Sequence, residues 1–138
     1  MNIFESFYQS MIIDNRYKYI LEGLKNTLLI SFFALILGVV LGIFIAFIRN
    51  NYKENQKHRF LNLLCSIYVT IIRGTPVVLQ LMIIYYVIFK QININVIFVG
   101  VLSFGLNSAA YVSEIIRAGV ESIDKGQKEA AYSLGLNY

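Results

Sequence analysis

The chain has 138 residues, of which 57% are hydrophobic and only 14% are charged, and its mean hydropathy is +0.62. Soluble domains carry roughly 25% charged residues, so this composition excludes an ordinary soluble domain and indicates a membrane protein. The net charge of +4 comes from segments between apolar runs. Such a pattern is typical of topology control in a membrane and argues against nucleic-acid binding.

Reactive side chains are scarce in this sequence. Cys65 and His58 are the only residues of their types, which excludes an internal disulfide and a multi-cysteine metal site. The sequence also lacks a nucleophile paired with a base and a glycine-rich phosphate loop. We therefore expect no enzymatic activity, no metal and no cofactor, and an energy source in another chain or in a gradient.

Residues 1–26 mix acidic, basic and aromatic side chains, which predicts an external interfacial segment with tyrosines at headgroup depth. Residues 27–48 carry no charge. As a helix they cover roughly 33 Å, enough to cross the hydrocarbon core, so we predict the first transmembrane helix there. Small residues recur at every fourth position and share one face of it: Ala34, Gly38, Gly42 and Ala46. This ladder predicts close helix packing, with a hinge as the alternative.

Residues 49–59 form a basic loop, which we expect on the cytoplasmic side, so that the N-terminus lies outside.

Residues 60–89 are apolar but are broken at 73–76, and neither half is long enough to cross a bilayer alone. Proline costs about 3 kcal/mol inside a helix but suits a first turn. We predict a lead-in helix over 60–72 and a second helix that begins at Pro76, with Thr75 as its N-cap.

Residues 90–95 are polar and predict an external turn, and residues 96–117 predict the third transmembrane helix. Residues 118–138 are polar and are expected in the cytoplasm. Within them, Asp124 can cap a short helix and Gly135 can end it. Four side chains share one face of that helix: Gln127, Ala130, Ala131 and Leu134. A helix of about ten residues is marginal alone in water, so this face predicts a partner.

Several polar side chains interrupt the apolar segments. An arginine at the bilayer centre costs about 2.5–3.5 kcal/mol, so Arg73 either reaches the headgroups or faces protein along a pathway. Glu114 and Arg117 lie three residues apart on one face, as an ordinary ion pair or as an inner gate. Gln80 and Asn107 can bond neighbouring helices or line a polar cavity.

Three stretches together resemble the permease subunits of ATP-binding-cassette importers for polar amino acids, of the histidine, glutamate, glutamine and arginine type. The first is 21–28, and the second is Arg73-Gly74-Thr75-Pro76, followed by Gln80 and Tyr85-Tyr86. The third holds Ala110-Tyr111, Glu114 and Arg117, and then Gly126-Gln127, Glu129-Ala130-Ala131 and Leu134-Gly135, which is similar to the coupling (EAA) loop of that family. The resemblance runs from about residue 17 to the end.

The resemblance implies an all-α membrane protein with the type I importer permease fold and a location in the bacterial inner membrane. It implies four protein or ligand partners: an ABC ATPase, a second permease copy or homologue, an external solute-binding protein and a polar amino acid, besides membrane lipid. The residues implied in ATPase coupling are Gln127, Glu129, Ala130, Ala131, Leu134 and Gly135. Those expected in the translocation path or gate are Arg73, Thr75, Pro76, Gln80, Asn107, Glu114 and Arg117.

Permeases of this family usually carry five spans, with two helices after the coupling loop. We therefore expect this sequence of three spans to be a truncated permease gene product, an incomplete permease sequence or a fragment of one. The alternative is a small membrane scaffold or regulator that binds a partner without transporting, and an intramembrane enzyme is the least favoured class. Neighbouring genes for an ATPase and a secreted binding protein would favour the importer.

Overall fold

The computed structural model describes residues 8–9, 12, 15–55, 59–92 and 94–136. Its elements are α2 (Tyr17–Asn55), α3 (Arg59–Gly74), α4 (Val77–Ile83), the π-helical turn η2 (Ile84–Ile88), α5 (Val96–Glu121) and α6 (Lys125–Ser133). No strand occurs in the described part of the chain. The predicted all-α membrane fold is confirmed.

Helix α2 is longer than the charge-free segment 27–48 that lies inside it. It has 39 residues, begins at Tyr17 and continues to Asn55. Residues 17–26 contain no proline and several good helix formers, so nothing in them ends a helix. The absence of charge marks the part of a helix that lipid can surround and does not mark the ends of the helix. Arg49 consequently belongs to the helix instead of a loop.

Among the described residues, two helices are long and apolar enough to cross a membrane, Tyr17–Tyr52 and Val96–Glu121. The pair Arg59–Gly74 and Val77–Ile88 is bent by 111° at its break and forms a third span if it is taken as one. Large apolar side chains cover the surface of α2, and Phe44 and Phe47 are more than half exposed. Such a surface is suited to lipid, because in water an apolar area of this size would drive aggregation.

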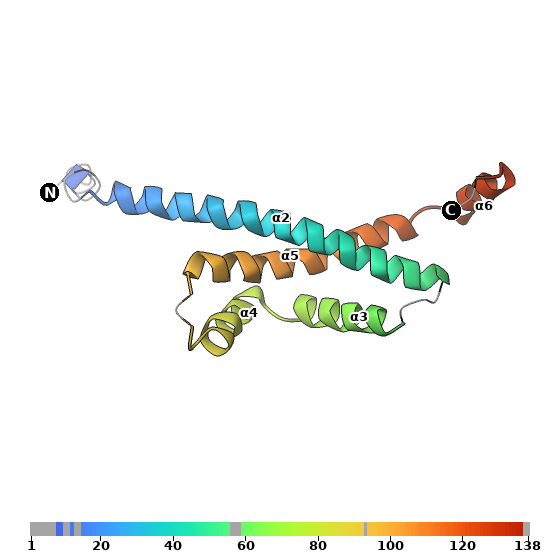
Figure 1. The fold of residues 1–138 in the computed structure, drawn as a ribbon. Coiled ribbons are helices and arrows are strands. Elements are labelled where there is room, and N and C mark those ends of the chain that lie inside the picture. Colours follow the sequence, from blue (N-terminus) through green and yellow to red (C-terminus); the bar gives the residue numbers. More distant parts are fainter. Residues whose placement is uncertain (1–7, 10–11, 13–14, 56–58, 93, 137–138) are drawn as a thin grey trace.

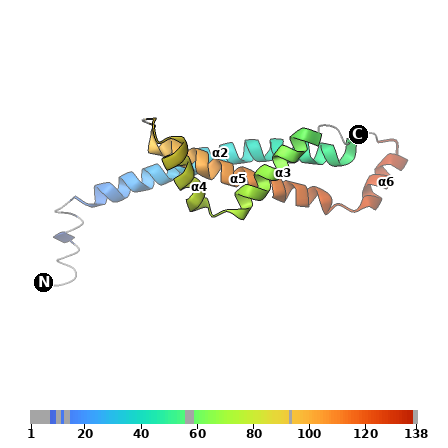
Figure 2. The same ribbon diagram turned by 90° about the horizontal axis from the view of Figure 1, so that it is seen from below.

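The helices form an elongated bundle in which α2 and α5 run side by side in the same direction (Figure 1). Helix α3 returns in the opposite direction, and α4 turns away from it at the break (Figure 2). The C-terminal end of α2 and helix α6 lie at one end of the bundle, while the link between η2 and α5 lies at the other. The described parts of the two segments predicted to be cytoplasmic, 49–55 and 118–136, thus lie at the same end.

Small residues let α2 and α5 approach closely. Ala34 and Ala46 of α2 are buried, and so are Ala109 and Ala110 of α5. A Cβ atom added to Gly38 would lie 2.5 Å from the Cβ of Ser108, and one added to Gly42 would lie 2.6 Å from the Cγ1 of Val112. The ladder of Ala34, Gly38, Gly42 and Ala46 therefore faces α5, and there is no space at its centre for a larger side chain.

The second span is broken where the sequence predicts, but the capping differs. Pro76, with φ −60° and ψ 135°, is itself the N-cap of α4, which begins at Val77. The prediction of Thr75 as the N-cap is wrong, because its hydroxyl donates backwards to the carbonyl of Ile71 at 2.9 Å. Helix α4 then continues into η2, where the N–H of Phe89 donates to the carbonyl of Ile84, five residues earlier.

Alanine substitutions of the glycines in α2 should affect the free energy of unfolding differently, depending on whether the glycine contacts α5. Gly38→Ala or Gly42→Ala places a methyl group against α5 and should lower the free energy of unfolding by about 1–3 kcal/mol. The matched control is Gly23→Ala, because nothing lies within 4 Å of its new Cβ. Alanine is the better helix former by about 0.5–1 kcal/mol, so this control should be neutral or stabilising. Thermal unfolding in detergent measures all three, and equal effects would show that the ladder does not pack.

Candidate functional site

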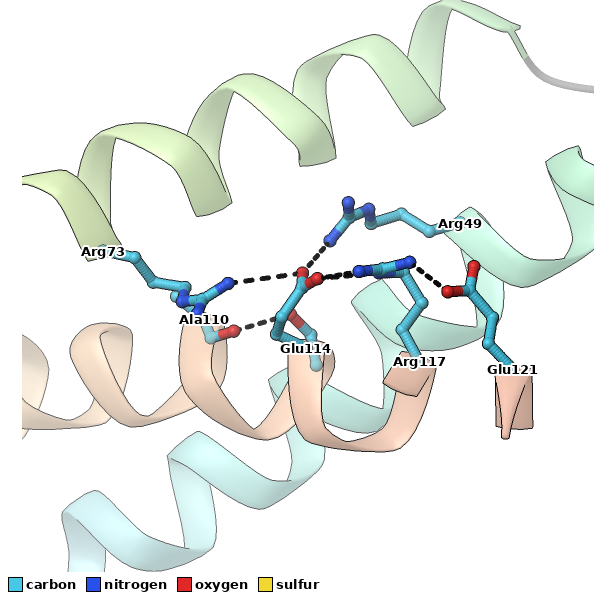
Figure 3. Close-up of polar contacts among 7 residues, drawn as sticks. Arg49, Arg73, Ala110, Glu114, Arg117 and Glu121 are labelled. Atoms are coloured by element: carbon cyan, nitrogen blue, oxygen red, sulfur yellow. Dashed lines mark hydrogen bonds and ion pairs between the residues drawn. The ribbon is translucent and has the colours of Figure 1, made fainter. Parts of the chain in front are cut away.

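Glu114 lies at the centre of a cluster of charged side chains. Its Oε2 accepts a hydrogen bond of 2.7 Å from Nη1 of Arg49. Its Oε1 accepts from the guanidinium of Arg117, with a distance of 2.8 Å to Nε. Nη1 of Arg73 lies 3.7 Å from Oε2, within ion-pair range (Figure 3). One carboxylate therefore attracts three guanidinium groups.

These groups come from three helices. Arg49 is on α2, Arg73 is in the last turn of α3, and Glu114 is on α5. Arg117 follows Glu114 by one helical turn, and its Nη1 donates to Glu121 one further turn along at 2.6 Å. The cluster thus ties all three main helices together near the end of the bundle that carries α6.

The cluster is partly shielded from solvent, and its three arginines are not held equally by Glu114. The side chains of Glu114 and Arg49 are 17% and 16% exposed, whereas that of Arg73 is 43% exposed. Arg73 also lies over the ring of Tyr111, 5.5 Å from its centroid, so its charge has a second favourable contact. Arg73 is the most loosely held of the three arginines, and it can leave Glu114 without breaking a direct hydrogen bond.

The other residues expected in the path lie at the helix break or farther along α5. Thr75, Pro76 and Gln80 form the break, where Gln80 is only 8% exposed and its Nε2 lies 2.8 Å from Oγ1 of Thr75. Asn107 precedes Glu114 by seven residues, so the two share one face of α5. The structure brings Arg73, Glu114 and Arg117 into one cluster and sets Thr75, Pro76 and Gln80 beside it as a separate polar group.

Helix α6 is capped at both ends as the sequence predicts. Oδ1 of Asp124 accepts from the N–H of Gly126 at 2.7 Å, which confirms it as the N-cap. Gly135 has a φ of +76°, in the left-handed region. The N–H of Leu136 donates to the carbonyl of Ala131, and that of Gly135 to the carbonyl of Tyr132, both at 3.0 Å. This pair of bonds is the Schellman motif, which confirms the predicted stop at glycine.

The face of α6 that the sequence predicts as a partner surface is largely exposed. Helix α6 projects from the end of the bundle beyond α5 (Figures 1 and 2). Gln127, Glu129 and Ala130 are exposed, Ala131 is half-buried, and Leu134 is 80% exposed. Small and apolar side chains thus lie on the outer surface of a helix that is capped and ready formed.

Sequence reasoning missed Arg49 and Glu121 as members of the cluster. Arg49 is the first charge after an apolar run, and that position predicts a loop. A carboxylate near the end of a span needs a partner, and Arg49 lies on the same side of the membrane as Glu114 in the predicted topology. That signal could have identified Arg49, whereas no sequence pattern indicates the distance between α2 and α5 at this point.

Comparison with known proteins supports a single family. Residues 15–138 match the family described as binding-protein-dependent transport system inner membrane component. The chain is 48% identical over 120 residues to the putative glutamine transport system permease protein GlnP of Rickettsia prowazekii, and the match covers 86% of this chain and 53% of that protein.

The chain is also 44% identical over 122 residues to the arginine transport system permease protein ArtQ of Bacillus subtilis, covering 87% of this chain and 53% of that protein. It thus spans about half the length of these curated relatives. A crystal structure of an amino acid ABC transporter with histidines has a TM-score of 0.69 and 38% identity, over 86% of this chain and 58% of that one. With a family match over nearly its whole length and this fold, the chain belongs to the inner membrane components of binding-protein-dependent transport systems.

Proposed function

We propose that this chain forms part of the permease subunit of an ATP-driven importer for polar amino acids, and that α6 docks on the ATPase. The single observation that carries the proposal is α6 itself. It is an exposed helix, capped at both ends, directly after α5 and at the same end of the bundle as the charge cluster. A helix of 9 residues is marginal alone in water, so its two caps lower the cost of ordering it and a docked partner supplies the remaining stabilisation.

The partners follow from the same family relation. The ATPase supplies the energy, because the sequence holds no nucleotide-binding loop of its own. A second permease copy or homologue completes the pathway, and an external solute-binding protein delivers a polar amino acid. The names of the relatives, a glutamine and an arginine transport permease, support that substrate class. In this proposal the N-terminus lies outside and α6 lies in the cytoplasm.

The charge cluster is proposed as an inner gate. Glu114 is joined firmly to Arg49 and Arg117 and loosely to Arg73, so movement of α3 can separate Arg73 while α2 and α5 stay paired. The three arginines outnumber Glu114 and Glu121, which leaves positive charge available to a carboxylate. Amino acids carry a carboxylate, so an opened gate of this composition favours them. Asn107 and the Thr75–Gln80 break are proposed to border the same path.

The proposal as a whole is tested by uptake in proteoliposomes that contain the complete transporter. ATP-dependent accumulation of a radiolabelled polar amino acid is expected when the complete permease pair that includes this chain, its ATPase and its binding protein are all present. ATPase binding without any uptake would instead support a scaffold or regulator. Genes for an ATPase and a binding protein next to this one are expected as well.

The proposed orientation is tested by labelling single cysteines in intact cells. In a Cys65→Ala background, Gln91→Cys should react with a membrane-impermeant maleimide from outside. Ser133→Cys should react only after the cells are made permeable, because α6 lies inside. Labelling of Ser133→Cys in intact cells would place α6 outside and end the docking proposal.

Docking of α6 on the ATPase should be weakened by a bulky side chain on one face of the helix only. Ala130→Trp adds a large ring to the face shared by Gln127 and Leu134, and overpacking at a fitted contact costs about 1–3 kcal/mol. Affinity for the ATPase should fall about tenfold or more, since 1.4 kcal/mol is a factor of ten. Co-purification with the coexpressed ATPase at graded concentrations measures this loss.

The matched control places the same ring on the other side of α6. Tyr132→Trp points away from the proposed face, because position 132 lies about 200° around the helix from Ala130, so it should leave ATPase association close to that of the native chain. Both variants should insert into the membrane normally, because α6 lies outside the spans. If the two tryptophans weaken association equally, the predicted face is wrong.

Removing the charge of Glu114, at the centre of the cluster, should lower the free energy of unfolding more than removing a charge at the edge of the cluster. Glu114→Gln leaves three guanidinium groups facing an uncharged side chain, and we expect a loss of about 2–3 kcal/mol in the free energy of unfolding. The control is Glu121→Gln, whose side chain is 33% exposed and whose salt bridge is worth less than about 1 kcal/mol. Denaturant titration in detergent compares them.

A second substitution separates charge repulsion from simple loss of packing. Adding Arg49→Gln to Glu114→Gln removes one uncompensated charge, so the double variant should recover part of the lost stability. No recovery would mean that the arginines do not repel one another and that the cluster is not a coupled unit.

A further inference from the structure

The proline at the break leaves one carbonyl of α3 without its usual partner. In an α-helix the carbonyl of Ile72 accepts from the N–H of residue 76, four positions later. Residue 76 is Pro76, which has no N–H, and α3 ends shortly before it at Gly74. Inside a membrane no water is available to satisfy such a carbonyl, so the break needs a donor from the protein.

The side chain of Gln80 supplies that donor. Its Nε2 lies 2.7 Å from the carbonyl oxygen of Ile72 and 3.0 Å from that of Thr75. The backbone N–H of Gln80 donates to the carbonyl of Pro76 at 3.2 Å, so Gln80 stands one turn beyond the proline and reaches back over it. The amide thus closes the gap that the proline opens.

The role lies in the amide nitrogen and not in the oxygen. Gln80 is 8% exposed, and its Oε1 is buried with no hydrogen-bond partner among the described residues. A buried acceptor without a partner is unfavourable, and a methionine of similar shape would avoid that penalty. The glutamine is therefore useful at this position for the hydrogens that it donates.

We infer that Gln80 is a positioning residue, whose amide replaces the backbone donor missing at Pro76 and so fixes the bend between α3 and α4. The bond to Ile72 holds the last turn of α3, and the next residue in that turn is Arg73, 3.7 Å from Glu114. Gln80 acts on the charge cluster through the backbone of α3. This inference does not depend on the transport proposal.

A double-mutant cycle between positions 76 and 80 tests the inference. Gln80→Met removes the donor and should lower the thermal unfolding temperature in detergent by several degrees when Pro76 is present. Pro76→Ala restores an N–H four residues after Ile72, so Gln80→Met should then lower the unfolding temperature less, because only the contacts of its amide with Thr75 are still lost. An equal loss in both backgrounds would overturn the inference, because it would mean that the amide does not replace the proline's donor.

The control substitution is Gln91→Met, the same chemical change at an exposed glutamine outside the helices. It should leave the unfolding temperature unchanged with either residue at position 76. A loss as large as that of Gln80→Met would assign the effect to the methionine itself and overturn the inference.

The bend can be measured directly and without transport. In a Cys65→Ala background, spin labels at Leu63 of α3 and Val87 of η2, both exposed, report the distance across the break. We expect Gln80→Met to broaden this distance distribution, and Gln91→Met to leave it as narrow as in the native chain. An unchanged distribution in Gln80→Met would overturn the role of Gln80 in fixing the bend, whereas failure of uptake alone would concern only the proposed function.

Discussion

Two helix backbones can approach closely only where side chains are nearly absent, and this constraint sets the central contact of the bundle, between α2 and α5. In lipid there is little hydrophobic drive for helices to associate, so close van der Waals contact must hold them together. Gly38 and Gly42 of α2 provide that contact by meeting Ser108 and Val112 of α5 without space for a Cβ atom. Helix α3 then packs on both, with the Tyr68 hydroxyl donating to the carbonyl of Leu106 on α5 at 2.6 Å.

The same contact brings charged groups together that are far apart in sequence. Arg49 and Glu114 are separated by 65 residues but form a hydrogen bond of 2.7 Å, because α2 and α5 run in the same direction with their C-terminal ends adjacent. Near a membrane the pairing of such charges is costly to lose, since little water replaces the missing partner. The ladder of small residues and the charge cluster are therefore two parts of one contact between α2 and α5. The contact is apolar along the bundle and ionic at the end of the bundle.

Local signals in the sequence identified the features that depend on neighbouring residues. The break at Pro76, the cap at Asp124 and the stop at Gly135 follow from one or two side chains each, and the structure contains all three. The spacing of Gly38 and Gly42 likewise predicted a packing face. Sequence reasoning missed the partnership of Arg49 with Glu114 because it depends on a contact between two helices far apart in the chain. It also missed the full length of α2, whose ends the charge-free segment does not mark, and the backward bond of Gln80 to Ile72 across the break. The error at Thr75 is a local one, because a hydroxyl can bond forwards as a cap or backwards to the preceding turn.

The length of α2 has a consequence for how the chain sits in its surroundings. Its 39 residues make a rod of roughly 58 Å, nearly twice the thickness of the hydrocarbon layer at about 30 Å. Tilting alone does not absorb such an excess, since transmembrane helices incline by only about 20° on average. The rod must therefore emerge into water or headgroups on at least one side, and a push applied to its protruding end is transmitted along an unbroken backbone to the opposite face of the bilayer.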